Sequence, residues 1–394
     1  MSDQPGVLPD TQLVALIERG HLTGDVAHIQ PNSLDLRLGN VAHRTRCSFL
    51  PVGQRVETLL QAFATNTVPL DDDGFVVDCN QTYIIPLMER VALPPGLCGF
   101  TNPKSSTGRL DILARILTDG GQAFDVIPDG YTGPLFIEII TRSFPIRIRP
   151  GDTLAQLRIF RGREVPIGDS ELRTLIDERG LVCDRDGIPI ASKDLDFADG
   201  VVLSVDLRGG DGATKEPTIG YRSKNWTPVV DLRARGLPVR DYWWREYRPY
   251  RRSDPLILEP HAFYIFASTE RVIVPPELCA EMVAIDVRSG EVRMHYAGFF
   301  DSGFGLVEGG SATPGAHVVL EVRNMYVPFH IQDGQRLFRV RFFRNSDVPS
   351  RLYGRNIASN YQGQGLRLAK QFAQEKPEQP QLRIHWPGDG GKRE

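Results

Sequence analysis

Two short segments combine a cation, small residues and an arginine at the same spacing. They read Lys104-Ser-Ser-Thr-Gly-Arg109 and Arg288-Ser-Gly-Glu-Val-Arg293. Small residues let backbone N–H groups approach an anion, hydroxyls donate hydrogen bonds, and flanking cations supply charge. A single segment of this kind is more often a solvated turn. Because the pattern recurs, we interpret both segments as polyphosphate-binding loops, with the candidate residues Lys104, Ser105, Ser106 and Arg109, and Arg288, Ser289 and Arg293.

Each of these basic loops is followed by a lone glutamate in an apolar stretch, Phe136-Ile-Glu138-Ile and Val319-Leu-Glu321-Val. In a strand, each glutamate would lie on the face opposite its two neighbours, and exposure to water is the default for a single one. A partly desolvated glutamate has a raised pKa and can transfer protons near neutral pH. Recurrence after both loops makes Glu138 and Glu321 candidate acid–base catalysts.

Several common catalytic signatures are absent from the sequence. It contains no GxxxxGK[ST], GxGxxG, HExxH or GxSxG motif. None of the eight histidines begins an H-x-E triplet, so the zinc-deaminase pattern is absent as well. The five cysteines lack CxxC spacing, which argues against a structural zinc site or a disulfide framework.

The loops and glutamates belong to a longer internal repeat. Glu89–Cys98 (ERVALPPGLC) and Glu270–Cys279 (ERVIVPPELC) agree at seven of ten positions without a gap. Three further pairs keep the same order: Asp10–Gly20 with Asp169–Gly180, Ser33–Arg37 with Ser204–Arg208, and Leu135–Glu138 with Val318–Glu321. Ordered self-similarity indicates two copies of one folding unit, and we expect Cys98 and Cys279 to be small buried hydrophobes.

Each copy begins with a predicted helix and continues as β structure. The helices are expected over residues 10–20 and 169–180, with Asp capping the N-terminus and Gly ending the helix. Pro145–Arg149 and Leu337–Arg341 alternate apolar and charged residues, which is typical of half-buried strands. The sequence therefore predicts a mainly β protein, each of whose copies opens with a short helix.

Length and composition suit a globular protein of 394 residues, 41% of them hydrophobic and 24% charged. At roughly 150 residues per domain, two or three domains are expected. We predict tandem domains at residues 1–164 and 165–372. Residues 373–394 are polar and are predicted to form a flexible extension.

The sequence also bears on where the protein is located and on what it binds. Residues 1–10 lack the features of a secretory signal, and no apolar run approaches the roughly 20 residues of a membrane span, so we expect a soluble cytoplasmic protein. A net charge of −3 argues against a broad nucleic-acid surface. Residues 240–252 mix aromatic residues with arginine, which we interpret as an inter-domain or oligomer contact.

Several motifs resemble those of the dCTP deaminases, a family related to the trimeric dUTPases. The family run R-S-S-x-x-R corresponds to Arg288–Arg293, and Q-P-x-S-x-D-L-R-L-G to Gln30–Gly39. The remaining motifs are A-x-x-I-D-P-G-[FW] at Ala297–Phe304, V-L-E-x-x-N at Val319–Asn324, and Y-x6-K-Y-Q-x-Q at Tyr353 and Asn360–Gln364. The resemblance extends over roughly residues 6–372 and implies the long form of the family, in which two dUTPase-like (β-clip or jelly-roll-like) domains are fused.

The resemblance implies hydrolysis of dCTP to dUTP and ammonia without zinc. Glu321 would take a proton from the water that attacks cytosine C4 and return it to the leaving nitrogen. Mg²⁺ would bind through the triphosphate, and the pockets would lie between domains or between subunits of a homo-oligomer. The implied substrate contacts are Arg288, Ser289 and Arg293 on phosphates or water, Asp301 on the deoxyribose, the backbone at Val319 and Leu320 on the base, and Tyr353, Asn360 and Gln364 in the closing tail.

The chain departs from the family pattern at three positions. Gly290 replaces the second serine of the loop, Asn360 replaces a lysine, and Pro128 stands where the first copy should have the ribose-binding aspartate. Two hybrid sites therefore remain open: the first basic loop facing Glu321, or the second facing Glu138. We favour Glu321 because Asp301 and the tail accompany it.

Three functions remain as alternatives. The first is dCTP deaminase, which the strand glutamate favours because dUTPases lack it. The second is a bifunctional enzyme that proceeds to dUMP. The third is a nucleotide sensor without catalysis, to which the altered motifs lend weight. Nucleic-acid binding is the least favoured.

Overall fold

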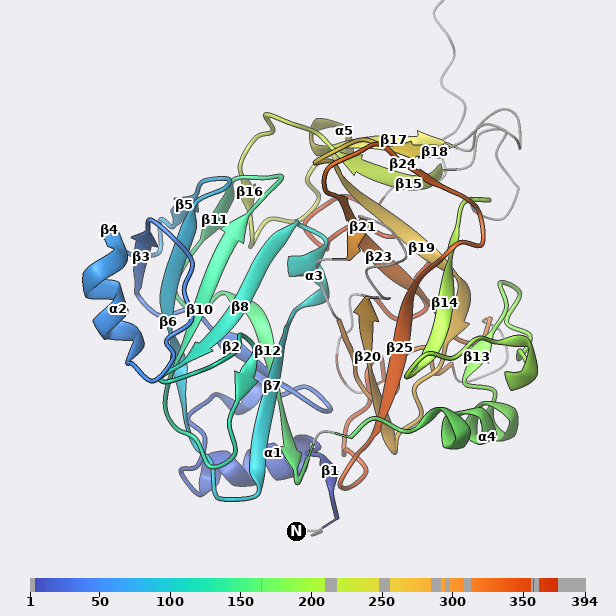
Figure 1. The fold of residues 1–394 in the computed structure, drawn as a ribbon, viewed down its shortest axis with the longest axis horizontal. Coiled ribbons are helices and arrows are strands. Elements are labelled where there is room, and N and C mark those ends of the chain that lie inside the picture. Colours follow the sequence, from blue (N-terminus) through green and yellow to red (C-terminus); the bar gives the residue numbers. More distant parts are fainter. Residues whose placement is uncertain are drawn as a thin grey trace, which may run out of the picture.

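The computed structural model describes residues 4–163, 165–209, 218–247, 256–284, 292–294, 298–307, 313–355, 357 and 361–374. Residues 4–163, the first half, and residues 165–374, the second half, lie side by side, blue to green-cyan and green to red in Figure 1. Both halves consist mainly of β-strands, as predicted. In the described part of the chain, no helix is long and apolar enough to cross a membrane.

The elements of the first half are β1 (Gly6–Val7), α1 (Asp10–Glu18), β2 (Leu34–Arg37), β3 (Val41–Thr45), α2 (Val56–Phe63), β4 (Ala64–Pro69), β5 (Phe75–Val77), β6 (Thr82–Ala92), β7 (Leu97–Pro103), α3 (Ser105–Gly108), β8 (Ile112–Thr118), β9 (Val126–Ile127), β10 (Thr132–Thr141), β11 (Ile146–Ile148) and β12 (Thr153–Arg161). Those of the second half are α4 (Asp169–Arg179), β13 (Val182–Cys183), β14 (Val201–Asp206), β15 (Thr218–Ser223), β16 (Val230–Asp231), α5 (Val239–Tyr242), β17 (Trp243–Tyr247), β18 (Leu256–Leu258), β19 (Phe263–Val272), β20 (Leu278–Ala284), β21 (Val292–Met294), β22 (Phe299–Phe300), β23 (Ala316–Asn324), β24 (Phe329–Ile331) and β25 (Arg336–Arg344).

The two predicted helices are present as α1 and α4, but the predicted aspartate caps are wrong. The N-caps are Pro9 and Gly168, and neither makes a side-chain capping bond. Each aspartate lies one position later, inside the first helical turn. Asp10 accepts hydrogen bonds from the backbone and hydroxyl of Ser350 in the second half, at 2.8 and 2.6 Å. The aspartate therefore connects the two halves instead of capping its own helix.

The strands that carry the two glutamates occupy matching places in the halves. In the first half β10 lies between β6 and β8, and Glu138 is opposite Ile84 and Arg115. In the second half β23 pairs with β19, and Glu321 is opposite Ile265. Successive side chains of a strand point to opposite faces of its sheet, so each glutamate lies on the face opposite its two neighbours. Both glutamates are buried, which excludes the default of exposure to water.

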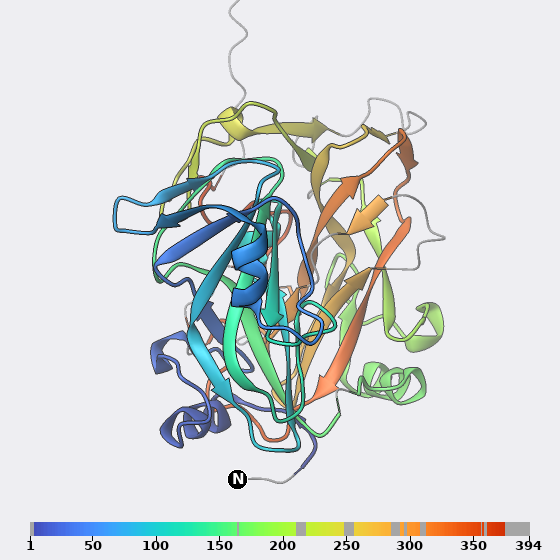
Figure 2. The same ribbon diagram turned by 60° about the vertical axis from the view of Figure 1, so that its left-hand side comes forward.

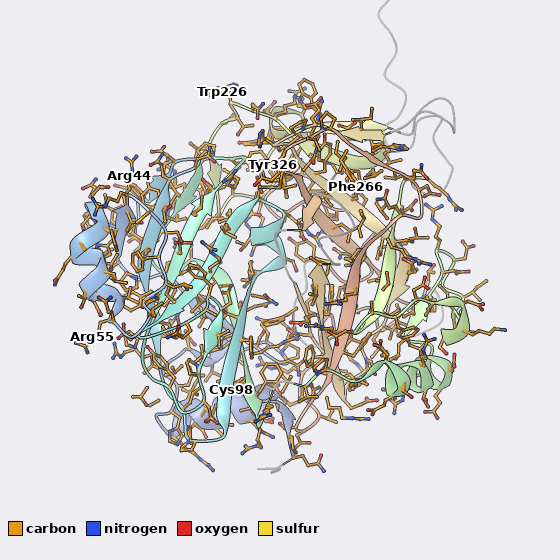
Figure 3. All side chains as sticks on the ribbon, viewed as in Figure 1. Arg44, Arg55, Cys98, Trp226, Phe266 and Tyr326 are labelled. Carbon is orange, nitrogen blue, oxygen red and sulfur yellow. The ribbon has the colours of Figure 1, made fainter. Side chains whose placement is uncertain are left out.

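The repeated ERV…LC segments contribute their cysteines to the contact between the halves. Phe160 on β12 meets Phe343 on β25 edge to face, with ring centroids 5.9 Å apart. Cys279 is buried in the same cluster, and Cys98 packs against this cluster; Figure 3 labels Cys98 in the lower part of the molecule. The prediction of a buried apolar role is confirmed for Cys279, whereas Cys98 is only half-buried.

One segment of the second half, residues 229–243, packs on the first half. Its strand β16 pairs in parallel with β11, and Asp231 accepts two hydrogen bonds of 2.8 Å from Arg149. Farther along, Trp243 is buried and packs edge to face on Phe144, at 5.2 Å between ring centroids. This part of residues 240–252 is an inter-domain contact, as predicted. This inter-domain contact lies at the end of the molecule where Figure 3 labels Trp226 and Tyr326.

Candidate active site

A pocket lies where the first half meets the second half, including the C-terminal tail of the second half (residues 353–374). In Figure 1, α3 is on the side of the first half that faces the strands of the second. The first half lines the pocket with Gln30, Asp35, Pro103–Ser106, Gly108, Arg109 and Gln156, the second half with Met282, Gly298–Asp301, Phe304, Val319 and Glu321, and the tail with Tyr353, Tyr361, Gln364 and Lys370.

The first basic loop reaches this pocket because the chain makes a single helical turn between two strands. β7 ends at Pro103, α3 spans Ser105–Gly108, and β8 begins at Ile112. The backbone of Lys104 and the hydroxyl of Thr107 both donate to the carbonyl oxygen of Leu154, at 2.9 and 2.8 Å. The loop is thus fixed to β12, and its side chains are held at the junction of the halves.

Glu321 enters the pocket from β23 and is only 4% exposed. Its Oε1 lies 3.8 Å from the Nε of Arg109, which comes from the other half. Burial raises the pKa of Glu321 to about 8, although the positive charge of Arg109 acts in the opposite direction. A carboxyl with this pKa can both accept and donate a proton near neutral pH.

The tail occupies the polar groups of the first basic loop. Arg109 donates to the side-chain oxygen of Gln364 at 2.9 Å and to the backbone oxygen of Arg367 at 3.0 Å. Its guanidinium also lies 3.9 Å from the centre of the Tyr361 ring. The hydroxyls of Tyr361 and Ser106 share a hydrogen bond. Any anion that binds this loop must therefore replace or share the contacts of the tail.

A buried ion pair joins the loop to the glutamate strand. Arg323 lies two positions after Glu321, and Asp111 two positions after Arg109. The guanidinium of Arg323 contacts Asp111 through Nη2 and, at 3.3 Å, through Nε. Both side chains are nearly fully buried. The pair fixes β23 against the loop, so it controls how Glu321 and Arg109 face each other.

Asp301 also depends on the opposite half. Arg158 on β12 donates to its Oδ1 at 3.0 Å and to the backbone oxygens of Phe300 and Ala280 at 2.9 and 2.8 Å. The guanidinium lies 3.9 Å from the centre of the Phe299 ring. Burial raises the pKa of Asp301, and the charge of Arg158 opposes that shift. Asp301 is thereby oriented at the pocket wall with one oxygen already bonded.

Glu138 does not line this pocket. It is fully buried on β10 and accepts hydrogen bonds from Arg115, one of them 3.1 Å long from Nε. The same side of the sheet is covered by α2, whose Val56 and Leu60 pack with Phe136. Figure 2 shows α2 in front of these strands. In the described part of the chain, the ion-pair partner of Glu138 is an arginine of its own half.

Models of known domain families match both halves of the chain. The model of the 2'-deoxycytidine 5'-triphosphate deaminase N-terminal domain matches residues 4–163, and that of the C-terminal domain matches residues 168–372.

The chain belongs to the dCTP deaminase family.

A crystal structure of 2'-deoxycytidine 5'-triphosphate deaminase from Agrobacterium tumefaciens resembles this structure with 42% identity and a TM-score of 0.78, over 86% of this chain and 99% of that one. A Persephonella marina protein named "dCTP deaminase, dUMP-forming" is 29% identical over 188 residues, 45% of this chain and 96% of its own. A Hyperthermus butylicus protein named "dCTP deaminase" is 30% identical over 162 residues, 39% of this chain and 85% of its own. Both match less than half of this dCTP deaminase family member, as a single copy of the repeat would.

The remaining candidate residues of this deaminase-family chain divide into three groups. Tyr353 lines the pocket, where burial raises its pKa to about 12. Val319 lines the pocket too, but the side chain of Leu320 packs in the core of the second half. Arg288, Ser289 and Asn360 lie outside the described residues, as does the side chain of Arg293.

Several pocket residues were not among the candidates from the sequence. Gln30 and Asp35 lie within the family motif Gln30–Gly39, and Tyr361 within the tail motif, so the resemblance could have indicated them. Lys370 lines the pocket and Arg158 contacts its wall residue Asp301, and both lie outside every motif. Arg158 is one of many arginines in alternating strands, and only its packing against Asp301 distinguishes it.

Proposed function

We propose that this enzyme hydrolyses dCTP to dUTP and ammonia at the junction of its two halves, without zinc. Membership of the family makes the chain an enzyme that acts on the cytosine amino group. The observation that carries the proposal is the buried Glu321, with a pKa of about 8, in the same pocket as the hydroxyl-and-arginine loop of the first half. A proton-transfer group and an anion-binding loop in one pocket suit a nucleotide whose base is to be deaminated.

In this proposal Glu321 acts as base and then as acid. Its carboxylate accepts a proton from water while the water oxygen forms a bond to cytosine C4. The carboxyl then gives that proton to the exocyclic nitrogen, and the C4–N bond breaks as ammonia leaves. The second proton of the water ends on N3 of the base as the C4 carbonyl forms, so that dCTP and water give dUTP and ammonia. Burial keeps the pKa of Glu321 near the working pH, where both transfers are efficient.

The other pocket residues would bind and orient the nucleotide. Ser105, Ser106 and Arg109 would bind phosphates, which requires Arg109 to exchange its contact with Gln364. Asp301, held by Arg158, has one oxygen left to accept a hydrogen bond from the deoxyribose hydroxyl. The backbone at Val319 and Leu320 would read the base edge. Tyr353 and Gln364 would close over the substrate.

Magnesium would enter as part of the substrate. In the described part of the chain, no group of three or more His, Cys, Asp or Glu side chains could hold a metal ion. The pocket carboxylates Asp35 and Asp301 are paired with Lys104 and Arg158. The donors that face the pocket therefore suit phosphate oxygens better than a cation, and we propose that Mg²⁺ is carried by the triphosphate.

A second candidate function is continued hydrolysis to dUMP. It is favoured by the name "dCTP deaminase, dUMP-forming" of the relatives from Persephonella marina and Mycolicibacterium vanbaalenii, the latter 30% identical over 176 residues. The first step and its glutamate would be the same. The additional step would need a second water directed at the α-phosphate.

One assay separates these functions. The protein is incubated with dCTP and Mg²⁺, and ammonia, dUTP, dUMP and pyrophosphate are quantified. Equal amounts of ammonia and dUTP without pyrophosphate support deamination alone. Ammonia with dUMP and pyrophosphate supports the bifunctional enzyme. Binding of dCTP without ammonia would contradict both proposals and favour a nucleotide sensor.

A further inference from the structure

The loop end of the pocket carries more positive charge than the family motifs supply. Lys370 of the tail lines this end, and it also lines an adjoining cavity. Lys104 and Ser106 are shared by the same two cavities. Arg233 and Arg235, from the segment of the second half that packs on the first, line the outer cavity. The pocket thus continues from the phosphate-binding loop toward a cluster of cations.

Most of these cations already have partners. Lys104 is paired with Asp35, and Arg233 donates to Asp152 at 2.8 Å. Arg235 donates to backbone oxygens of its own turn. Lys370 differs, because in the described part of the chain no carboxylate lies within ion-pairing distance of its ammonium group. Burial, and then the charges of Lys104 and Arg235, lower the pKa of Lys370 to about 8. A half-buried ammonium among like charges is stabilised by binding an anion.

We propose that Lys370 binds the terminal phosphate of the nucleotide and makes the enzyme prefer triphosphates over monophosphates. This inference rests on the proposed function, because it assumes that a deoxycytidine nucleotide occupies the pocket. Its phosphate chain would run from Arg109 and Ser106 toward Lys370 and the outer cavity.

The backbone around Lys370 is held in place before any ligand binds. Its own backbone nitrogen donates to the Tyr361 hydroxyl at 3.1 Å, the same hydroxyl that bonds Ser106. The next residue, Gln371, donates to the backbone oxygen of Leu232 at 3.0 Å. Phe372 packs on Trp243, with ring centroids 5.8 Å apart. A cation on a fixed backbone loses less conformational entropy when it binds, so Lys370 is suited to discriminate by phosphate number.

The test compares Lys370→Met with wild type on dCTP and dCMP. Loss of one charge-assisted contact to phosphate should lower kcat/KM for dCTP about 10- to 100-fold. For dCMP, which does not reach Lys370, kcat/KM should change less than about twofold. Lys370→Arg should restore most of the preference. Lys193→Met removes an exposed lysine that lines neither cavity and should leave kcat/KM for both substrates unchanged.

Calorimetry then compares Lys370→Met with wild type for binding of the products dUTP and dUMP, where no reaction occurs. A dUTP-to-dUMP affinity ratio that collapses in Lys370→Met, with dUMP affinity unchanged, supports the inference. An unchanged ratio, or an equal loss for both nucleotides, would overturn it. Failure of the wild type to release ammonia from dCTP would contradict the proposed function alone, because the binding ratios still report on Lys370.

Discussion

Glu138 and Glu321 occupy equivalent positions in the two copies of the repeat, and both are buried, yet their surroundings differ. Glu321 faces a pocket and lies 3.8 Å from Arg109 of the other half. Glu138 is bonded to Arg115 of its own half and lies beneath α2. Two positions before each glutamate, Val319 lines the pocket while Phe136 packs into the cluster with α2. The two strands therefore differ both in what covers them and in the residues that flank each glutamate.

The comparison explains how a duplicated chain can keep one site and convert the other into structure. Arg323, which binds Asp111 across the junction, is matched in the first copy by Ile140, two positions after Glu138. The position that contributes the ion pair to the loop is thus an arginine in the second copy and an apolar residue in the first. In the proposed function, the second copy supplies the acid–base group and the first supplies the phosphate-binding loop.

The largest effect should separate the two glutamates. Glu321→Gln removes the proton-transfer group and should lower kcat for ammonia release about 10²- to 10⁴-fold. Glu138→Gln is the matched control and should change kcat less than about threefold in the folded enzyme. Steady-state ammonia release measures both. A Glu321→Gln enzyme with full activity would refute the assignment, as would an equal loss in both variants.

Asp111→Asn should have the next largest effect, because it weakens the pair that positions Glu321 against Arg109. Asparagine tolerates the positive φ of 56° at this position, so the fold should persist. Misplacing a reacting group by about 1 Å can cost roughly 10²-fold, and we expect kcat to fall about 10- to 100-fold. Arg323→Gln should have a similar effect, and the double variant little more. A positioning role predicts this non-additivity together with an altered pH profile. Additive losses with an unchanged profile would contradict it.

The pH dependence of kcat/KM should follow the ionisation of Glu321. Its pKa is raised from 4.5 to about 8 in the folded chain, so the carboxyl is mostly protonated below about pH 8. Because the first step needs the carboxylate, kcat/KM should rise about tenfold per pH unit below this value and level off above it. Glu138→Gln should keep the same midpoint. A flat profile between pH 6 and about 9 would show that another group limits the reaction.

The smallest effects concern stability, and they should have opposite signs for the two glutamates. Glu138→Gln weakens a buried ion pair and should lower the free energy of unfolding by about 1–3 kcal/mol. The folded chain holds the proton of Glu321 more tightly than the unfolded chain, so stability falls as pH rises from 4.5 to about 8. Glu321→Gln should therefore raise the melting temperature at pH 8 and not at pH 5. Thermal unfolding at pH 5 and pH 8 measures the melting temperatures and urea unfolding the free energies, and a Glu321→Gln enzyme that is less stable than wild type at pH 8 would contradict this expectation.

The sequence predicted the repeat, the helix–strand content and nine of the 21 residues that line the pocket, because these depend on local patterns and on motifs. It left open which loop faces which glutamate, since that depends on how the halves pack. Glu138 and Phe136 lie on the face of the sheet that α2 covers, and no sequence pattern indicates that α2 packs there. The aspartate caps failed for the same reason, because Asp10 binds Ser350, 340 positions away. Arg158 and Lys370 acquire their roles only through contacts between distant segments.

The most direct test of the central claim is a crystal structure of the Glu321→Gln enzyme with dCTP and Mg²⁺. We predict cytosine C4 within hydrogen-bond reach of residue 321, directly or through one water, and phosphate oxygens on Ser106 and Arg109 of the same chain. A nucleotide whose base lies beside Glu138, or whose phosphates are bound by a loop of a neighbouring chain, would contradict the account.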